Sequence, residues 1–269
     1  MASVKTLVIT GYGTNCEVES AHGAKLAGSD QTDIVFFSDI AADKVRLPDY
    51  NFLIFPGGFL DGDDLGAGQA GAIRWKYAKS AKGSSLLDQL KDFIAQGGLV
   101  LGVCNGFQLL VKLGLLPCLN SAYFERQVTL SNNDSGRFED RWVRVVMNPQ
   151  SPCVFTKGLT WLDLPVRHGE GKIIAQNEKT LADMVSNNLI ALQYADPATN
   201  QPTQQYPLNP NGSPLAIAGL TDPSGRILGL MPHPEAFNHP TNHPGWTRGE
   251  HPTLGIAILE NAVRHLREQ

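Results

Sequence analysis

The chain has 269 residues, of which 42% are hydrophobic and 18% charged, enough for a sizeable core in one large α/β domain or two small ones. Its formal net charge of -4 provides no basic surface, which argues against nucleic acid as the primary partner. The first residues lack a signal-peptide pattern, no apolar run approaches the ~20 residues of a membrane helix, and the four cysteines form no CxxC pair, so we expect a reduced, cytoplasmic setting.

The N-terminal half alternates between short apolar runs and segments with helical patterns. The apolar runs predict strands at residues 4–10, 33–37, 51–55 and 98–103. Helices are expected at residues 17–28, 69–80 and 84–95. Near-continuous apolar strands separated by helices are typical of a parallel sheet covered on both faces. We therefore predict a doubly wound α/β fold with a mostly parallel sheet.

The C-terminal half is more broken. Strands are expected at 139–148 and 188–194, and a hairpin is expected to join 214–220 to 226–231. Residues 195–213 are rich in Pro, Asn, Gln and Gly and predict a surface loop, and residues 253–267 predict a closing amphipathic helix. No repeat and no long linker divides the sequence, so residues 1–269 are expected to form one domain.

The segment Gly102-Val103-Cys104-Asn105-Gly106 has the form of a nucleophile elbow, a sharp turn between a buried strand and a helix. Small residues flank the nucleophile because such a turn leaves no room for side chains. The turn places the thiol at the carboxyl edge of the sheet and at a helix N-terminus, where the dipole favours the thiolate. A lone cysteine is more often a buried structural residue. In this context, however, Cys104 is the predicted nucleophile.

A cysteine nucleophile needs a base and a group that orients the base. Met231-Pro232-His233-Pro234-Glu235 follows an apolar strand and supplies both. The prolines favour an extended path, in which residues two apart point the same way, so His233 and Glu235 are expected to share one face. Alone, the sequence His233-Pro234-Glu235 would be ordinary loop composition. Beside the elbow it completes a candidate triad, with His233 as the base and Glu235 holding its tautomer.

A third motif, Phe55-Pro56-Gly57-Gly58-Phe59, also follows a strand. Glycines there allow backbone N–H groups to approach an oxyanion closely, and with the amide of Asn105 they would form an oxyanion hole. A glycine pair after a strand is common, so this motif carries weight only beside the other two. It matches neither the dinucleotide-binding nor the P-loop pattern.

Together these motifs resemble the class I (triad) glutamine amidotransferases, and most closely their branch in phosphoribosylformylglycinamidine synthase of purine biosynthesis. The segments that carry the resemblance span nearly the whole chain and include Gly13-Thr14-Asn15-Cys16-Glu17, Pro56-Gly57-Gly58-Phe59, Gly102-Val103-Cys104-Asn105-Gly106-Phe107-Gln108, Asn133-Asp134-Ser135-Gly136-Arg137-Phe138-Glu139, His168-Gly169-Glu170-Gly171, Asn209-Pro210-Asn211-Gly212-Ser213 and Met231-Pro232-His233-Pro234-Glu235. The triad motifs mark the superfamily, whereas Asn-Gly-Phe-Gln, His-Gly-Glu-Gly and Pro-Asn-Gly-Ser point to this branch.

The resemblance implies a flavodoxin-like fold and hydrolysis of L-glutamine to glutamate and ammonia. Cys104 would attack the side-chain amide and His233 would give a proton to the leaving ammonia, while backbone amides of Gly58 and Asn105 would bind the oxyanion. Three further residues carry over less directly. Gln108 would line the glutamine pocket; His168 and Glu170 would line that pocket or contact the synthetase, unless they only cap a turn.

The resemblance also implies that ammonia travels through a tunnel to a separate synthetase subunit. No ATP-binding motif is recognisable in this chain, so ATP and Mg²⁺ are expected on that partner, with no cofactor here. The chain is longer than compact glutaminase subunits, at residues 69–85 and 236–254. This leaves the quaternary arrangement open, including the need for a small accessory subunit.

Two further sets of residues invite a function. Cys16 follows the first strand and is either a second reactive thiol or, because its flanks lack the elbow glycines, a structural or interface residue. His239, His243 and His251 follow His233 within one loop. Their neighbours are mostly prolines rather than carboxylates and their spacing matches no familiar zinc pattern, so no metal site is expected.

Three rival functions stay open on the sequence. A class I amidotransferase serving another synthase would share the triad, although the His-Gly-Glu-Gly and Pro-Asn-Gly-Ser segments argue against it. A cysteine peptidase or stress protein of a related fold would share the elbow, and partner-dependent glutaminase activity would exclude it. A non-catalytic regulatory subunit would have no need of an intact Cys104, His233 and Glu235 set.

Overall fold

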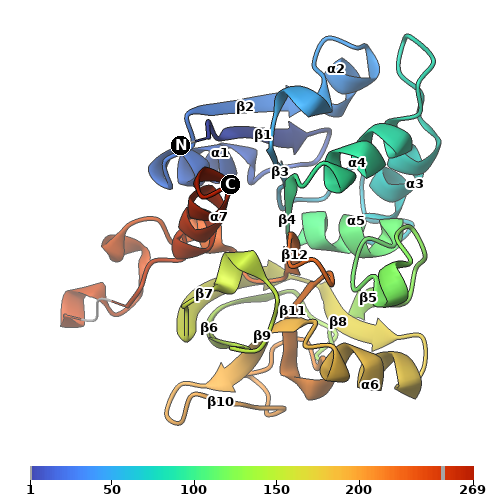
Figure 1. The fold of residues 1–269 in the computed structure, drawn as a ribbon. Helices are drawn as coiled ribbons and strands as arrows, with labels where there is room; N and C mark the ends of the chain where they lie inside the picture. Colours follow the sequence, from blue (N-terminus) through green and yellow to red (C-terminus); the bar gives the residue numbers. More distant parts are fainter. Residues whose placement is uncertain (1, 250–251) are drawn as a thin grey trace.

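A ten-stranded sheet runs through the protein, as Figure 1 shows for this computed structural model, which describes residues 2–249 and 252–269. Five parallel strands form one part of the sheet, in the spatial order β2-β1-β3-β4-β12. Their bounds are Lys5–Thr10 (β1), Gln31–Phe36 (β2), Phe52–Phe55 (β3), Leu99–Val103 (β4) and Ile227–Leu230 (β12). This strand order is that of flavodoxin-like folds, whose ligands bind beyond the carboxyl ends of the strands.

The predicted strands of the N-terminal half are confirmed, and so is the reason for them. Every residue of β3, β4 and β12 is buried. A strand covered on both faces has no solvent side on which polar residues could alternate, so its sequence is a continuous apolar run. The α/β fold with helices on both faces of a parallel core is likewise confirmed.

Antiparallel strands extend the sheet beyond β12. They are Ile217–Thr221 (β11), Ile190–Asp196 (β9), Glu139–Met147 (β6) and Trp161–His168 (β7), with the short β10 (Gln201–Pro202) on β9. A separate pair consists of β5 (Val128–Asn132) and β8 (Glu170–Ala175). The predicted hairpin is present, because β11 and β12 pair antiparallel around a turn at residues 222–225.

Seven α-helices accompany the strands in the described part of the chain. Their bounds are Glu17–Leu26 (α1), Phe37–Ala41 (α2), Gln69–Tyr77 (α3), Leu86–Ala95 (α4), Asn105–Leu113 (α5), Glu178–Ser186 (α6) and Ala257–Arg267 (α7). In Figure 1, α1 and α7 lie together on one side of β3 and β4, and α3, α4 and α5 lie on the other. Among the described residues, no helix has the length and apolar character needed to cross a membrane.

The closing helix begins later than predicted. It starts at Ala257 rather than at residue 253, because the preceding backbone packs tightly against the loop that carries His233. A Cβ on Gly255 would lie 2.5 Å from the Pro234 carbonyl oxygen and 2.8 Å from Leu164. This glycine therefore docks the start of α7 against the loop after β12.

The segment 195–213 is only in part the surface loop that was predicted. Residues 197–207 are mostly exposed, but Asn209, Asn211 and Ser213 are each at most 1% exposed. Asn211 Nδ2 donates to the Gly171 carbonyl and to the Tyr194 hydroxyl, and the Ser213 hydroxyl accepts from the Ile173 amide at 3.0 Å. These bonds hold β8, and with it the segment around residue 170.

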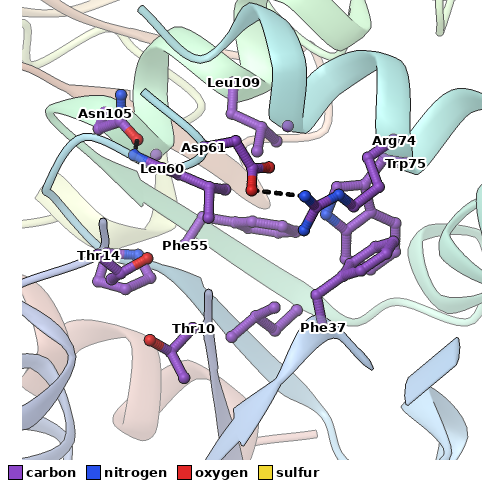
Figure 2. A pocket seen from close by; sticks show the side chains of 14 residues that line it. Thr10, Thr14, Phe37, Phe55, Leu60, Asp61, Arg74, Trp75, Asn105 and Leu109 are labelled. Atoms are coloured by element: carbon purple, nitrogen blue, oxygen red, sulfur yellow. Dashed lines mark hydrogen bonds and ion pairs between the residues drawn. The ribbon is translucent and has the colours of Figure 1, made fainter. Parts of the chain in front are cut away.

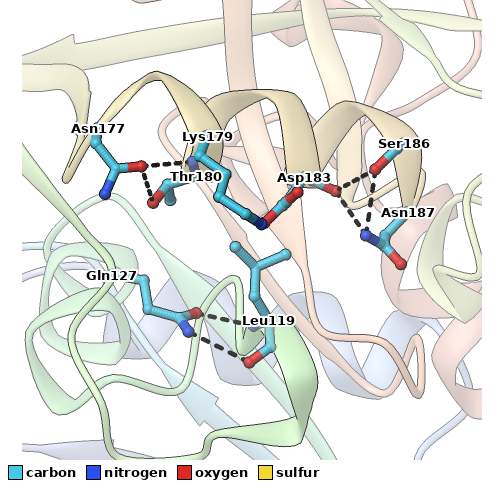
Figure 3. A network of polar contacts seen from close by, with 8 residues as sticks. All are labelled: Leu119, Gln127, Asn177, Lys179, Thr180, Asp183, Ser186 and Asn187. Carbon is cyan, nitrogen blue, oxygen red and sulfur yellow. Dashed lines mark hydrogen bonds and ion pairs between the residues drawn. The ribbon is translucent and has the colours of Figure 1, made fainter.

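Helix α6 covers a loop between α5 and β5, and neither α6 nor β5 was assigned from the sequence. Figure 3 shows Asn177 capping the helix, with its Oδ1 accepting from the Thr180 amide at 2.8 Å. Below the helix, the Gln127 side chain bonds both backbone groups of Leu119. A few buried contacts and a good N-cap therefore suffice for this short, largely polar helix.

A continuous cluster of buried apolar residues joins the parallel and antiparallel parts. It contains Leu7 and Leu101 from the former and Val145 and Leu164 from the latter, all at most 1% exposed. The expectation of one domain over residues 1–269 stays a prediction.

Candidate active site

The carboxyl ends of β1, β3, β4 and β12 meet at one edge of the sheet, and the predicted site residues lie there. Cys104 follows β4, the Gly57-Gly58 pair follows β3, and His233 comes three residues after β12. The backbone joins two of these segments directly, because the Cys104 amide donates to the Leu230 carbonyl at 2.8 Å. Cys16 and His233, which are 217 positions apart in the sequence, thus become neighbours at this edge.

Cys104 lies in a strained turn between β4 and α5. Its φ is 52° and its ψ is -107°, a conformation that side chains other than glycine rarely adopt. Both elbow glycines are required for space: a Cβ on Gly102 would lie 2.6 Å from Leu110, and one on Gly106 would lie 1.8 Å from the Phe55 carbonyl oxygen. The G-x-C-x-G pattern therefore reports a real steric constraint, as predicted.

His233 and Glu235 form a buried dyad. Nδ1 of His233 lies 2.6 Å from Oε1 of Glu235, and each residue is 2% exposed. The residues meet for a different reason than predicted. Pro234–Ala236 forms a 3-10 turn rather than an extended segment, and the turn brings the carboxylate back against the imidazole. The His233 amide donates to the Pro165 carbonyl of β7 at 2.8 Å, which fixes the loop.

The charge state of His233 depends on its neighbours. Burial alone would lower its pKa, but the Glu235 carboxylate and the adjacent Cys104 raise the pKa well above its usual value. An imidazole in these surroundings readily holds a proton that it can later give up. Nε2 of His233 has no hydrogen-bond partner among the described residues, so it is available to a substrate or nucleophile.

Two backbone amides near Cys104 are available to bind an anion. The amides of Gly58 and Asn105 donate no hydrogen bond to any residue in the ranges 2–249 and 252–269. Gly58 has a φ of 143°, and a Cβ there would lie 2.6 Å from the Gly13 carbonyl oxygen. Only glycine can place this N–H beside the elbow, which is the arrangement an oxyanion hole needs.

The loop that carries Gly58 is anchored from behind. A small cavity of about 20 Å³ lies beneath it, and Asp61 on its wall forms an ion pair with Arg74 at 2.5 Å. The side chains of this ion pair point toward each other in Figure 2. In the same view the Leu60 amide donates to Oδ1 of Asn105 at 3.0 Å. The Arg74 guanidinium also lies over the Phe37 ring, 5.4 Å from its centroid. These contacts hold the loop after β3, which carries Gly58, against α3 and α5.

A pocket of about 120 Å³ opens in front of the Cys104 thiol. Its walls come from the ends of β1, β3 and β4, from the loop after β12 and from the β7–β8 connection. They consist of Asn15, Cys16, Gly58, Phe59, Asp63, Cys104, Gln108, Phe138, Arg167, His168, Gly169, Glu170 and His233. The pocket thus holds the predicted nucleophile, the predicted base and one predicted oxyanion donor together.

The three predicted glutamine-pocket residues lie in this pocket, but two are engaged with the protein itself. Gln108 Nε2 donates to the Glu170 carbonyl, and its Oε1 accepts from Asn105 at 3.0 Å. The Glu170 carboxylate accepts from the Ala67 amide at 3.1 Å. These hydrogen bonds of Gln108 and Glu170 connect α5 to the loop after β3 and shape the wall of the pocket. Their contact with glutamine stays a prediction.

His168 is the third of these residues and is 3% exposed. Its Nδ1 lies 3.1 Å from Oδ1 of Asn133, while its Nε2 has no partner among the described residues. Burial, together with the charge of His233, lowers the pKa of His168 to about 3. A neutral imidazole with one free nitrogen therefore faces the pocket.

Two further residues line the pocket although no role was predicted for them. Arg167 lies on β7, where no motif marks it, and Phe138 lies just before β6, within the segment 133–139 that carries the family resemblance. The Arg167 carbonyl accepts from the Cys104 thiol at 3.6 Å, so β7 contacts both the nucleophile and the loop of the base. Cys16, for which a second reactive thiol was one of the two roles considered, lies in the pocket, and so does Asn15 beside it. Both follow the first strand, at the edge where ligands bind.

The histidines after His233 show no metal cluster among the described residues. His239 accepts from the Thr241 amide at the start of a short 3-10 helix. His243 packs against the rings of Trp142 and Phe237. His251 lies outside the described residues.

Comparison with known proteins identifies the family. The model of the CobB/CobQ-like glutamine amidotransferase domain matches residues 3–266. A phosphoribosylformylglycinamidine synthase subunit PurQ of Methanococcus maripaludis is 46% identical over 240 residues, covering 89% of this chain and 86% of that protein. The PurQ subunit of Dehalococcoides mccartyi is 41% identical over 272 residues, covering 100% of both chains.

The fold also has counterparts among solved structures. A chain in the PurLQS structure from Thermotoga maritima matches with a TM-score of 0.69 and 24% identity, over 98% of this chain and 100% of that one. A glutamine amidotransferase structure from the same organism matches with a TM-score of 0.54 and 13% identity. Both likenesses concern the fold alone.

Proposed function

Because this chain belongs to the CobB/CobQ-like glutamine amidotransferase family and is similar to PurQ subunits, we propose that it is the glutaminase subunit of a phosphoribosylformylglycinamidine synthase. It hydrolyses L-glutamine and supplies ammonia to an ATP-dependent synthetase in purine biosynthesis. The observation that carries the proposal is the His233–Glu235 dyad meeting the strained Cys104 at one pocket. A binding or regulatory subunit would have no need to maintain such a set.

The first half of the reaction acylates Cys104. Its thiolate attacks the side-chain amide carbon of glutamine, and negative charge develops on the amide oxygen. The free amides of Gly58 and Asn105 bind that oxygen. His233 then gives the proton on Nε2 to the departing nitrogen, so that ammonia leaves and a glutamyl thioester remains.

The second half of the reaction releases glutamate. Neutral His233 takes a proton from a water molecule through Nε2, and the resulting hydroxide attacks the thioester carbon. The carbon–sulfur bond breaks, which returns Cys104 as a thiolate beside a protonated imidazole. Glu235 holds Nδ1 and with it the tautomer that leaves Nε2 free for both transfers.

The partner completes the reaction. ATP and Mg²⁺ act on the synthetase, and this chain needs no cofactor for the hydrolysis. A cytoplasmic location suits this role and is supported by four free cysteines in the described structure.

The test measures glutamate release from glutamine by the purified chain, alone and with synthetase, ATP and formylglycinamide ribonucleotide. Strong stimulation by the complete mixture, lost in Cys104→Ala, is the expected result. Glutamine hydrolysis that this synthetase does not stimulate would assign the chain to another synthase. No hydrolysis under either condition would refute the proposal and favour a peptidase or a non-catalytic subunit.

A further inference from the structure

Cys16 is a second thiol at the active site, and the proposed chemistry does not use it. It follows β1, is 6% exposed and lines the same pocket as Cys104. Its Sγ lies 3.9 Å from Nδ1 of His233, on the side of the imidazole that faces Glu235. Burial raises the pKa of this thiol, while the contact with His233 lowers it.

The three side chains together offer one ligand atom each to a common point. Sγ of Cys16, Nδ1 of His233 and a carboxylate oxygen of Glu235 all lie within 4.8 Å of one another. Ligand atoms around tetrahedral zinc are roughly 3.3 to 3.6 Å apart. The observed separations of 3.9 Å for S to N and 2.6 Å for N to O bracket that range. Small side-chain rotations would therefore close the set on an ion.

A second observation is that part of this set has no partner at present. Oε2 of Glu235 is buried and makes no hydrogen bond to any described residue, in a side chain only 2% exposed. Such an orphaned carboxylate oxygen is costly unless it is neutralised or bound. Cys16 and His233 both reach the pocket, which gives an ion access and leaves room for water as a fourth ligand.

We infer that Cys16, His233 and Glu235 form an inhibitory site for Zn²⁺, which binds reversibly and is not a resident cofactor. Thiolate, imidazole and carboxylate are ligands of a borderline-soft ion, whereas Mg²⁺ and Ca²⁺ prefer oxygen alone. Binding displaces the Cys16 thiol proton and the Nδ1 proton of His233 to solvent.

The inhibition follows from the tautomer. An imidazole bound to zinc through Nδ1 keeps its remaining proton on Nε2. That nitrogen then cannot accept a proton from water or from Cys104, and Glu235 is withdrawn from its orienting role. The effect on catalysis rests on the proposed function, whereas the binding of the ion does not.

Zinc binding to the metal-free, reduced full chain is measured first, by competition with a fluorescent zinc indicator. We expect one Zn²⁺ per chain, both for the wild type and for Cys104→Ala, since the nucleophile is not a ligand. Cys16→Ser should weaken binding by at least the about 10- to 100-fold that loss of an outer-shell partner costs. Cys118→Ser, which alters a buried thiol outside the pocket, should leave it unchanged.

Cobalt provides a spectroscopic counterpart. A thiolate-to-cobalt charge-transfer band should appear with Co²⁺ in Cys104→Ala and be absent in Cys16→Ser. If Cys16→Ser fails to fold, the zinc affinity of Glu235→Gln supplies the same comparison. Binding that survives in Cys16→Ser but disappears in Cys104→Ala would assign the ion to the catalytic thiol and overturn the inference, as would the lack of stoichiometric binding.

Glutamine hydrolysis is assayed last. Zinc should inhibit the wild type, a chelator should restore it, and Cys16→Ser should resist inhibition. Equal inhibition of the two would refute the inhibitory role. A chain without any glutaminase activity would refute the proposed function instead, while the binding experiments would still decide the ion site.

Discussion

At the scale of single residues, the site depends on glycines, whose lack of a side chain leaves space for the catalytic groups. Gly57 illustrates this, because a Cβ at this position would lie 2.8 Å from Cε1 of His233 and 3.2 Å from Sγ of Cys16. The backbone there is not left-handed, so an alanine would meet a packing problem and no conformational one. The imidazole would have to move.

Gly57→Ala should therefore reduce glutamine hydrolysis on the order of 100-fold, as expected when a catalytic group is displaced by about 1 Å. The chain should still fold, which a thermal melt would verify. Gly23→Ala is the matched control. It lies in α1 at ordinary contact distances of 3.5 to 3.9 Å, and it should keep full activity and gain up to about 1 kcal/mol of stability. Equal activity of the two variants would show that His233 tolerates the shift.

His168 gives a prediction about pH. Its pKa falls from about 6.5 in the unfolded chain to about 3 in the folded one, so between these values the unfolded state binds the extra proton. The free energy of unfolding should accordingly decrease as pH falls below 6.5, by up to about 1.4 kcal/mol per pH unit from this residue. More than about one unit above pH 6.5 the residue contributes almost no pH dependence.

The comparison with His168→Gln isolates this contribution, since glutamine can still donate a hydrogen bond to Asn133 but does not titrate. Urea unfolding at the ordinary histidine pKa of about 6.5 and about one pH unit to either side would measure the free energy of unfolding of both proteins. The difference between wild type and variant should change little between about pH 7.5 and 6.5 and most between about pH 6.5 and 5.5. Parallel curves throughout would mean that His168 is not held neutral.

At the scale of elements, the loop after β3 joins the oxyanion donor to the ion pair between Asp61 and Arg74. Asp61 has a φ of 59°, a conformation that asparagine also tolerates. Asp61→Asn thus removes the charge without straining the backbone. We expect stability to decrease by about 1.5 kcal/mol, the lower end for a hydrogen bond to a charged group, and kcat to fall several-fold as the Gly58 amide loses its support.

A double-mutant cycle with Arg74→Ala distinguishes this coupling from two separate effects. If the ion pair positions the loop, the second substitution should add little to the loss of kcat caused by the first. Fully additive losses would contradict the coupling. An unchanged kcat together with lower stability would limit the ion pair to a structural role.

The elements also show what could be predicted from sequence and why. The elbow at Cys104 was predictable because its steric demand is local: a strand, a strained residue and two glycines are contiguous in the chain. The strand β7 was not, because it contains Pro165 and proline argues against a strand, even though Leu162, Leu164 and Val166 alternate on its buried face. Proline is tolerated there because β7 lies at the edge of the sheet.

Edge position is a tertiary property, so no local pattern reveals it. The consequence for the site was considerable, since the carbonyls of Pro165 and Arg167 hold the loop of His233 and the thiol of Cys104. The contact between Cys16 and His233, 217 residues apart, could not be predicted either, because it too depends on the tertiary fold. Motifs identified the reacting groups, and only the fold showed what surrounds them.

At the scale of the whole molecule, this chain performs half of a reaction. The thiol, the imidazole and the Gly58 amide of the glutaminase site lie together in one pocket of this chain. The acceptor and ATP belong to another subunit under the proposed function. Damage to Cys104 should therefore remove the source of ammonia and leave the synthetase intact.

The complex of Cys104→Ala with its synthetase tests this separation. Glutamine-dependent synthesis should fall to background, on the order of the millionfold loss seen when a comparable triad loses its nucleophile. Synthesis from added ammonium salt should continue at the wild-type rate, because ammonia then reaches the acceptor without hydrolysis here. Cys104→Ala removes only Sγ from a buried side chain and keeps Cβ, so the turn and the assembly are expected to be preserved. Loss of both activities would instead mean that Cys104 maintains the complex, whereas retention of glutamine-dependent synthesis would remove it as the nucleophile.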